Sequence, residues 1–343
     1  MSKPSISFLP LGANLFEYTV GSIPLVLSLP NQHAYTSTTN PAFFGETIGR
    51  VANRTKSGLL NLNNKTYQLP KNNGPNSLHG GHKGWGKQLW SGPFPENRRG
   101  AEGVRFELTS KDGDSGYPGT VLAKAWYIAR ESNNNKVELE VEYECAFASS
   151  TSETGQQGET ISETAINMTN HTAFSIGPVP AKGTSRSIAG TQVTLFTDLR
   201  QEVDDEAIPT GNVTKHPGVK VGEPITLGPA EPKFDDCFVL PLDPSSIPLD
   251  TRGGEMRKLA SFWHPETKVR FEVESTEPAF QFYTGEFIDL EYEGEVFKKR
   301  AGFCVEASRY IDAAGKKEWE GMVKVKRGEV WGSRTVYRAW REE

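Results

Sequence analysis

The alternation of apolar and acidic residues over 136–147, KVELEVEYECAF, constrains the fold of this chain more than any other feature. Six apolar or weakly polar side chains, from Val137 to Phe147, occupy every second position, and four glutamates occupy the positions between them. Successive side chains of a β-strand point to opposite faces, so this period of two predicts a strand with one face in a core and the other in water. We therefore interpret the four glutamates as a solvated face.

The same period recurs along the chain, and no helical period competes with it. Strands are predicted at 104–110 (VRFELTS), 268–275 (KVRFEVES), 279–283 (AFQFY), 322–327 (MVKVKR) and 335–340 (TVYRAW). No window of helical length has a clear apolar stripe at i, i+3, i+4 and i+7. The 34 glycines and 22 prolines are spread throughout, as in chains of many short strands joined by turns. We predict an all-β fold, a large antiparallel β-sandwich of packed sheets.

The sequence predicts a single domain over residues 1–343. It contains no Pro/Ser/Gly-only linker and no repeat of fixed period. The polar stretch 149–164 is the strongest candidate for a domain boundary, but it ends directly in the strand-like AINMT, which favours a hairpin within one domain. At this length a core can be large enough that neither disulfides nor structural metals are needed.

Charge, cysteine content and the longest apolar stretch argue against several functional classes. The 38 Lys and Arg residues against 43 Asp and Glu give a net charge of -5, which argues against a nucleic-acid partner. The three cysteines are scattered without C-x-x-C spacing, which favours a reducing compartment. IPLVLSLP, from Ile23, is too short to cross a bilayer, and the first residues lack an apolar core of signal-peptide length. We expect a soluble cytoplasmic protein that binds neither nucleic acid nor membrane.

Three short motifs resemble ligand sites but lack residues that those sites require. GHKGWGK (81–87) has the glycine and lysine spacing of a phosphate-binding loop, but Gln88 stands where Ser or Thr would hold magnesium. His79 and His82 form an H-x-x-H pair with no further zinc ligand at a recognisable spacing. DGDSG (112–116) lacks the downstream glutamate of a calcium loop. We predict no metal site and no cofactor.

Three polar side chains remain that local structure alone does not explain. His79 lies in PNSLHGG, where Asn, Ser and Gly suffice for a turn. His171 follows a strand-like segment in INMTNHTAF, and either histidine taken alone is more often structural than catalytic. Glu306 lies among apolar residues in AGFCVEASRY, where a buried carboxylate costs free energy unless it has a partner or a ligand. Asp235 and Asp236 likewise open an apolar run. A carboxylate in such a place usually has a partner or a ligand.

Eight separated segments resemble, in order, those of the aldose 1-epimerases, also called galactose mutarotases. They are GETIGRVANRTKSG (45–58), NGPNSLHGGHKGWGKQLW (73–90), GDSGYPG (113–119), NMTNHTAF (167–174), AIPTGNV (207–213), KFDDCF (233–238), FQFYTGEF (280–287) and GFCVEASRYIDA (302–313). Each segment alone is a weak signal, whereas their joint order is specific. The resemblance implies the family's large antiparallel sandwich, the galactose mutarotase-like supersandwich, in agreement with the period of two.

The resemblance also implies roles for individual residues. Glu306 is expected to be the general base and His171 the general acid. His79 is expected to hydrogen-bond the sugar near its ring oxygen, and Asp235 to accept hydrogen bonds from ring hydroxyls. The remaining expected substrate-binding residues are Arg54, which would orient the sugar and tune neighbouring charges, Gln281, which would lie beside the base, and Asn53.

The implied activity is interconversion of the α and β anomers of aldohexoses such as glucose and galactose. Ring opening removes a proton from the C1 hydroxyl and delivers one to the ring oxygen, which requires a base and an acid. The two groups must therefore lie no farther apart than the width of one pyranose. A monosaccharide is the expected partner, no metal or organic cofactor is needed, and we expect a monomer or a weak homodimer.

Two departures from the family pattern bear on the preferred sugar. Glu286 of TGEF stands where the family often has Asn, which is expected to add a carboxylate near the site. Asp236 and Cys237 stand where the family often has FDHNF.

Three other functions remain open. A glycoside hydrolase would use two facing carboxylates, for which Glu306 and Asp235 are the candidates. A sugar-binding or sensing protein on the same scaffold would bind without exchanging anomers. An epimerase of sugar phosphates would need a basic cluster for the phosphate. The basic pairs available for it are Arg54 with Lys56 and Lys83 with Lys87.

Overall fold

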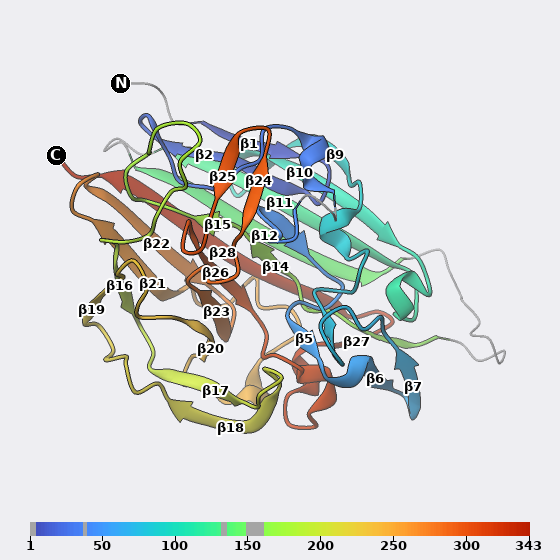
Figure 1. The fold of residues 1–343 in the computed structure, drawn as a ribbon. Helices are drawn as coiled ribbons and strands as arrows, with labels where there is room; N and C mark the ends of the chain where they lie inside the picture. The colour runs from blue at the N-terminus through green and yellow to red at the C-terminus, as the bar shows by residue number, and fades with distance from the viewer. Residues whose placement is uncertain (1–4, 37–39, 132–135, 149–160) are drawn as a thin grey trace.

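The computed structural model describes residues 5–36, 40–131, 136–148 and 161–343. Within these ranges the chain forms β-strands joined by turns, and each helical segment is a 3-10 turn of three or four residues (Figure 1). The prediction of an all-β fold is confirmed. The stretch 149–160, where we predicted part of a hairpin, lies outside the described residues.

The largest sheet has nine antiparallel strands, and the long strands that the period of two predicted lie at its centre. Its strands, in spatial order, are β19 (Pro224–Thr226), β16 (Gln192–Leu195), β21 (Arg257–His264), β22 (Val269–Ser275), β28 (Val330–Arg341), β12 (Val137–Phe147), β11 (Val121–Glu131), β10 (Ala101–Ser110) and β9 (Ser91–Arg98). The C-terminal strand β28 is hydrogen-bonded to β12 on one side and β22 on the other. Segments from the middle and from the last part of the chain therefore share one sheet.

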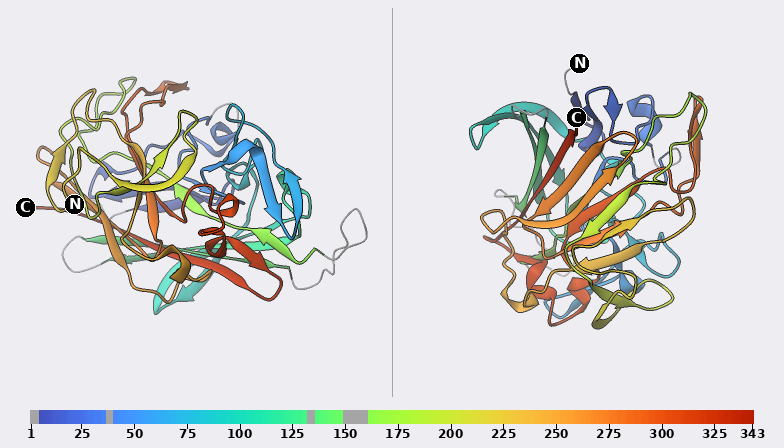
Figure 2. Two further views of the ribbon diagram at one scale, coloured as in Figure 1. Left: turned by 90° about the horizontal axis from the view of Figure 1, so that it is seen from below. Right: turned by 90° about the vertical axis from the view of Figure 1, so that its left-hand side faces the viewer.

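A second sheet of six antiparallel strands packs on the first and carries the strand with the unexplained carboxylate. In spatial order it contains β15 (Ala173–Phe174), β26 (Phe303–Ser308), β23 (Ala279–Tyr283), β20 (Asp235–Val239), β17 (Leu199–Val203) and β18 (Pro209–Lys215). Aromatic rings join the two layers: Phe303 of β26 stacks on Phe262 of β21 with 4.2 Å between ring centroids. Seen from below, the long green and red strands of the larger sheet lie along one side of the molecule (Figure 2).

Smaller sheets and short turns complete the fold. The three-stranded sheet contains β1 (Ile6–Leu9), β2 (Asn14–Val20) and β3 (Ile23–Pro24). The two-stranded pairs are β4 (Glu46–Ile48) with β14 (Thr169–His171), β5 (Arg54–Thr55) with β8 (Ser77–Leu78), β6 (Leu59–Leu62) with β7 (Lys65–Gln68), β13 (Glu163–Ala165) with β27 (Lys324–Lys326), and β24 (Leu290–Tyr292) with β25 (Glu295–Phe297). The 3-10 turns are η1 (Gln32–Tyr35), η2 (Lys56–Gly58), η3 (Trp85–Lys87), η4 (Asp114–Gly116), η5 (Pro244–Ser246), η6 (Ala313–Gly315) and η7 (Glu320–Met322). None of the helical segments in the described part of the chain has the length and apolar character that crossing a bilayer requires.

The outer face of β12 corrects one prediction from the sequence. Glu140 and Glu142 are 5% and 0% exposed, so the acidic face of this strand is not solvated throughout. Arg98 and Arg99, at the turn between β9 and β10, form ion pairs with Glu142, and Arg252 approaches the same carboxylate at 3.5 Å. A period of two determines the face on which a side chain lies, but not which residues from elsewhere cover that face.

Strand β26 is buried on both faces, which explains its unusual composition. All six of its residues are buried. Phe303 and Val305 point into the core between the two sheets. Cys304 and Glu306 alternate with them and therefore lie on the opposite face, which the N-terminal half of the chain covers. Glu306 is thus a carboxyl group enclosed beneath a second layer.

Candidate active site

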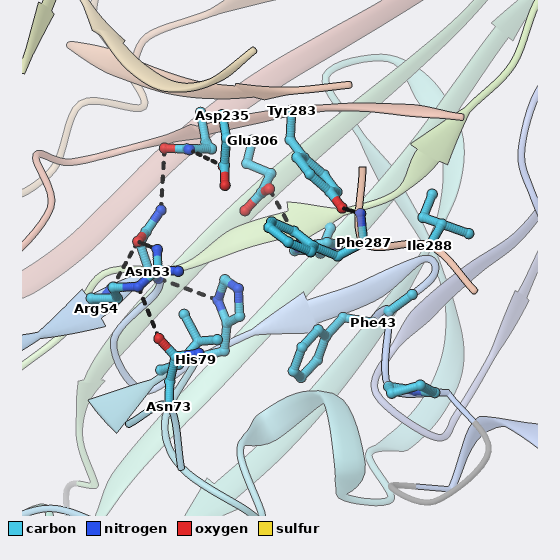
Figure 3. Close-up of a pocket in the computed structure, with 15 residues that line it drawn as sticks. Phe43, Asn53, Arg54, Asn73, His79, Asp235, Tyr283, Phe287, Ile288 and Glu306 are labelled. Carbon is cyan, nitrogen blue, oxygen red and sulfur yellow. Dashed lines mark hydrogen bonds and ion pairs between the residues drawn. The ribbon is translucent and has the colours of Figure 1, made fainter. Parts of the chain in front are cut away.

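A cavity of about 340 Å³ lies over this face of the six-stranded sheet. The seven site residues expected from the sequence all line it: Asn53, Arg54, His79, His171, Asp235, Gln281 and Glu306. Asp235 and Glu306 lie on one side of the cavity, while Asn53, Arg54 and His79 lie on another (Figure 3). The fold therefore brings together residues that are up to 253 positions apart in the chain.

Three neighbouring strands supply the acidic wall of the cavity. Gln281 of β23 lies directly opposite Glu306 of β26 in the antiparallel register. Asp235 of β20 lies opposite Tyr283, two residues further along β23 and on the same face as Gln281. The position of each side chain is therefore set by strand register, which is a rigid support for a site.

A chain of hydrogen bonds orients the amide groups of this wall. The Asn53 side chain donates from Nδ2 to Gln281 Oε1 at 3.2 Å, and Gln281 Nε2 donates to Asp235 Oδ1 at 2.7 Å. The Asn53 Oδ1 atom accepts from the backbone N–H of Arg54 at 2.9 Å. Because the Gln281 amide is fixed by a partner at each end, Asp235 is held as a hydrogen-bond acceptor at the mouth of the cavity.

The turn PNSLHGG holds His79 over the cavity. Its backbone N–H donates to the Asn53 carbonyl at 3.0 Å, and its Nδ1 atom accepts the Asn53 backbone N–H at 3.2 Å. Gly80, at φ +80°, passes so close to strand β4 and its flank that an added Cβ would lie 2.1 Å from the Gly49 carbonyl oxygen. The glycine is therefore required for the close approach, and the approach places the imidazole inside the cavity.

His79 is committed to one tautomer by this contact. A neutral imidazole whose Nδ1 accepts a backbone N–H carries its proton on Nε2 and offers a donor there. Burial, together with the nearby His171 and Arg54, lowers the pKa of His79 well below its usual value, so the ring is neutral at pH 7. His79 is thus equipped to donate a hydrogen bond rather than to act as a strong acid.

His171 and Glu306 form the closest pair of titratable groups in the cavity. His171 Nε2 lies 3.4 Å from Glu306 Oε1, and both side chains are buried. His171 reaches this position from β14, which pairs with β4 at the edge of the cavity. On the other side of the ring, Cys304 Sγ lies 3.9 Å from His171 Nδ1. The sequence prediction required these two groups to lie within one pyranose width, and they do.

Burial determines the protonation of the pair. It lowers the pKa of His171 to about 4 and raises the pKa of Glu306 to about 8, with Asp235 raising the latter further and Arg54 opposing it. Between these values the two groups together bind one proton. Between these pH values the proton is on Glu306, whereas the expected roles of general base and general acid require a carboxylate and an imidazolium. The proton count is the same in both arrangements.

The atoms of His79, His171 and Glu306 also form a possible metal-binding set. One ligand atom from each lies within 4.8 Å of the others in the described part of the chain. Binding through His79 Nε2 would require the tautomer that has a proton on Nδ1, which would face the Asn53 N–H. The set therefore fits hydrogen bonding to an organic ligand better than metal coordination. His82, the second histidine of the H-x-x-H pair, is exposed and does not line the cavity.

Apolar residues that the sequence analysis missed form the rest of the cavity wall. Phe43, Tyr283, Phe287 and Ile288 lie on the side facing the polar groups (Figure 3). Phe43 contacts both imidazoles, with ring centroids 4.9 Å from His79 and 5.5 Å from His171. No periodicity distinguishes these four residues from core residues, although three of them, Tyr283, Phe287 and Ile288, lie within or directly after the FQFYTGEF segment.

Asn73 is a further residue that the sequence analysis missed. It lines the cavity, and its Oδ1 atom accepts a hydrogen bond from Arg54 Nε at 3.0 Å. Asn73 lies in the polar run KNNGPNS, where its neighbours are equally suited to a turn. Only the hydrogen bond to Arg54 distinguishes Asn73 from the neighbouring residues of this run.

The two family departures do not reach the cavity. Glu286 forms an ion pair with the buried Arg300 at 2.6 Å and accepts a hydrogen bond from Thr284. Asp236 lies on the face of β20 opposite to Asp235 and pairs with Arg200. Neither residue lines the cavity. Glu286 was expected to add a carboxylate near the site; it lies close enough to raise the pKa of Asp235, after burial, but the buried Arg300 pairs with it outside the cavity lining.

The sequence matches a family model. The model described as Aldose 1-epimerase matches residues 2–338. The galactose mutarotase of Bos taurus is 34% identical over 307 residues, which cover 86% of this chain and 78% of that protein. The bifunctional protein GAL10 of Pachysolen tannophilus is 38% identical over 340 residues, which cover 98% of this chain and 45% of that protein. The chain thus spans less than half the length of the bifunctional relatives.

Solved structures share the fold. An aldose epimerase homologue from C. elegans superposes with a TM-score of 0.77 at 21% sequence identity, covering 99% of this chain and 97% of that one. A galactose 1-epimerase from Lactobacillus acidophilus has a TM-score of 0.76, also at 21% identity, covering 99% and 92%. At this level of identity the likeness concerns the fold.

Proposed function

The chain belongs to the aldose 1-epimerase family, and from this premise we propose that it interconverts the α and β anomers of aldohexoses such as glucose and galactose. The observation that carries the proposal is the His171–Glu306 contact of 3.4 Å inside a cavity of about 340 Å³. The C1 hydroxyl and the ring oxygen are bonded to the same carbon, so a base and an acid this close can serve both atoms of one pyranose.

In the proposed reaction the pair supplies one base and one acid. Glu306 removes the proton from the C1 hydroxyl. The C1–O5 bond then breaks, its electron pair stays on O5, and O5 receives a proton from His171. The C1–C2 bond then rotates, and closure on the other face of the aldehyde reverses both transfers. Binding of the sugar must first place the shared proton on His171. No redox change takes place, and the residues named are sufficient for each proton transfer.

The remaining polar residues are proposed to hold the sugar. His79 donates from Nε2 near the ring oxygen, since its Nδ1 is occupied by the backbone. Asp235 accepts from ring hydroxyls, and Arg54, fixed by Asn73, orients them together with Asn53 and Gln281. A pyranose presents C–H groups on its faces, and the aromatic side of the cavity is suited to pack against them.

The contacts argue against the alternative of a sugar phosphate. Of the four basic residues considered for a phosphate, only Arg54 lines the cavity. Lys83 is exposed outside it, whereas Lys87 is paired with Glu46. A phosphate group in the cavity would therefore contact the guanidinium of Arg54 alone among these four residues, and not a cluster of basic side chains.

Polarimetry tests the proposed function. Fresh α-glucose, α-galactose and glucose 6-phosphate are followed in parallel, and the uncatalysed rate is subtracted. We expect faster approach to equilibrium for the free sugars. Binding of these sugars without faster exchange would identify a sugar-binding protein, and release of sugar from an aryl glycoside would identify a hydrolase.

A bell-shaped pH dependence of kcat/KM follows from the single proton on the pair. Below a pH of about 4 His171 is also protonated and no base is left, and above a pH of about 8 Glu306 has lost the proton and no acid is left. We expect a plateau between these values, since kcat/KM reports the free enzyme. Polarimetry in steps of half a pH unit checks it. A rate that kept rising well above pH 9, after subtraction of the uncatalysed reaction, would contradict the pair.

A further inference from the structure

A buried ion pair lies directly behind the aromatic wall of the cavity. The Lys87 ammonium is bonded to the Glu46 carboxylate and donates to the Asn40 carbonyl oxygen at 2.9 Å. Lys87 is the lysine of the GHKGWGK motif, which has the spacing of a phosphate-binding loop but has Gln88 in place of its Ser or Thr. Its side chain is 9% exposed and that of Glu46 is 1% exposed. An ion pair removed from water in this way is weak evidence for a contribution to stability, so another role must be sought.

The pair fixes the loop that carries Phe43. Asn40 Nδ2 donates to Glu46 Oε1 at 2.7 Å, and the Phe44 backbone N–H donates to Asn40 Oδ1 at 3.1 Å. Between them Phe43 has φ +55°, a left-handed conformation that is unfavourable for a bulky residue. Such a conformation persists only where its surroundings enforce it. This conformation places the Phe43 ring against both imidazoles.

The Lys87 ammonium also lies over the ring of Phe43. Lys87 Nζ is 5.2 Å from the centroid of Phe43, whose other contacts are His79 and His171. Its positive charge lowers the pKa of both histidines, after burial. In the described part of the chain, the other titratable or charged groups around His171 include Glu306 and Cys304 on β26, Tyr283 on β23, His79 after β8, Glu46 on β4, and Arg54 and Asp235 across the cavity.

We propose that Lys87 is a positioning residue for the reaction: held by Glu46 and Asn40, it contacts the Phe43 ring that packs on the two imidazoles, and it opposes the gain of positive charge on His171. The inference rests on the proposed function for its consequence. An imidazolium that binds its proton weakly gives it up readily to the ring oxygen of the sugar. Glu46 completes the arrangement, since η3 approaches it closely: a Cβ on Gly86 would lie 2.2 Å from Glu46 Oε2.

The test compares Lys87→Met with Glu46→Gln. Lys87→Met removes the positive charge, so the acid limb of the kcat/KM profile is expected to move up by roughly one pH unit. Burial raises the pKa of Glu46 to about 7, so its carboxyl is already neutral at the acid limb. Glu46→Gln is therefore expected to leave that limb unchanged. If the only effect were a looser 40–46 loop, the acid limb would shift equally in Lys87→Met and in Glu46→Gln.

Three further measurements keep the test decisive. Lys83→Met removes an exposed charge from the same motif and is expected to behave as the wild type. The double variant Lys87→Met/Glu46→Gln leaves no unpaired carboxylate, so it replaces Lys87→Met if that single variant fails to fold. Its acid limb is expected to move up by the same amount. NMR titration of the His171 Cε1–H signal, identified by its loss in His171→Asn, reports the shift without turnover.

The outcomes separate this proposal from the proposed function. An acid limb and a His171 titration that stay at their wild-type pH in the folded Lys87→Met variant overturn the role of Lys87, whatever the activity. Equal shifts in Lys87→Met and Glu46→Gln also overturn it. Absence of anomer exchange in the wild-type protein refutes the proposed function and leaves the NMR titration still able to decide the effect of Lys87.

Discussion

Replacing Glu306 by Gln is expected to abolish nearly all catalysed anomer exchange while the protein still folds and binds sugar. The amide has the shape of the protonated carboxyl group, so the cavity and the contact with His171 are preserved. It cannot accept the proton of the C1 hydroxyl, and loss of one general base lowers the rate by about 10²–10⁴-fold. Polarimetry on α-glucose measures the loss of kcat, and calorimetric titration measures the retained binding.

A neighbouring carboxylate provides the control for this variant. Asp236→Asn removes a carboxylate next to Asp235, but on the other face of β20, where it pairs with Arg200. Its kcat is expected to stay close to that of the wild type. Near-normal exchange in Glu306→Gln would show that another group is the base, and equal losses in both variants would point to general damage to the strands.

Thermal unfolding gives an independent reading of Glu306. The folded-state pKa of this carboxyl is raised to about 8, above its unfolded value, so its contribution to stability is full at low pH and is lost as the pH rises through about 8. The glutamine cannot lose a proton. The Tm of Glu306→Gln is therefore expected to rise relative to the wild-type Tm as the pH increases from 5 to 9. A constant difference would mean that Glu306 titrates normally.

Replacing His171 by Asn is expected to lower kcat by a similar factor, about 10²–10⁴-fold, because the asparagine has no proton to exchange at these pH values. His79→Asn is expected to act differently. His79 is a neutral donor held by the Asn53 backbone, so its loss should raise KM more than it lowers kcat. Steady-state polarimetry over a range of sugar concentrations separates the two constants.

His82→Asn is the control for the histidine variants. His82 belongs to the same turn as His79 but is exposed and does not line the cavity, so its replacement should change neither constant. If His171→Asn weakened binding while leaving kcat intact, His171 would be a binding residue and the acid would have to be another group.

Local sequence was sufficient for the strands and for the residues that break a local rule. The alternation in 136–147 predicted β12, and the runs at 279–283 and 335–340 predicted β23 and part of β28. Glu306 was found because a carboxylate in an apolar strand needs a partner, and His79 because a turn does not need an imidazole. The remaining site residues came from the ordered resemblance to a family, and the structure places all of them around one cavity.

Contacts between distant segments could not be read from these patterns. Glu142 lies at a position that a period of two assigns to water, yet Arg98 of β9 and Arg252 of a turn lie against it. Glu286 belongs to a site motif by sequence, yet Arg300 holds it away from the cavity. Phe43 has no unusual neighbours in sequence, and Lys87 drew attention only as part of a phosphate-loop pattern; their proposed roles depend on contacts between the 40–46 loop and η3.

By itself, the sequence determined the period of the strands, the turns between them, and which side chains were out of place in their local surroundings. Each of these depends on residues a few positions apart. The tertiary structure alone decided which groups meet and how they are charged. The 3.4 Å contact between His171 and Glu306 joins two strands 135 positions apart, and the pKa values of both groups are set by the layers of protein that exclude water from them.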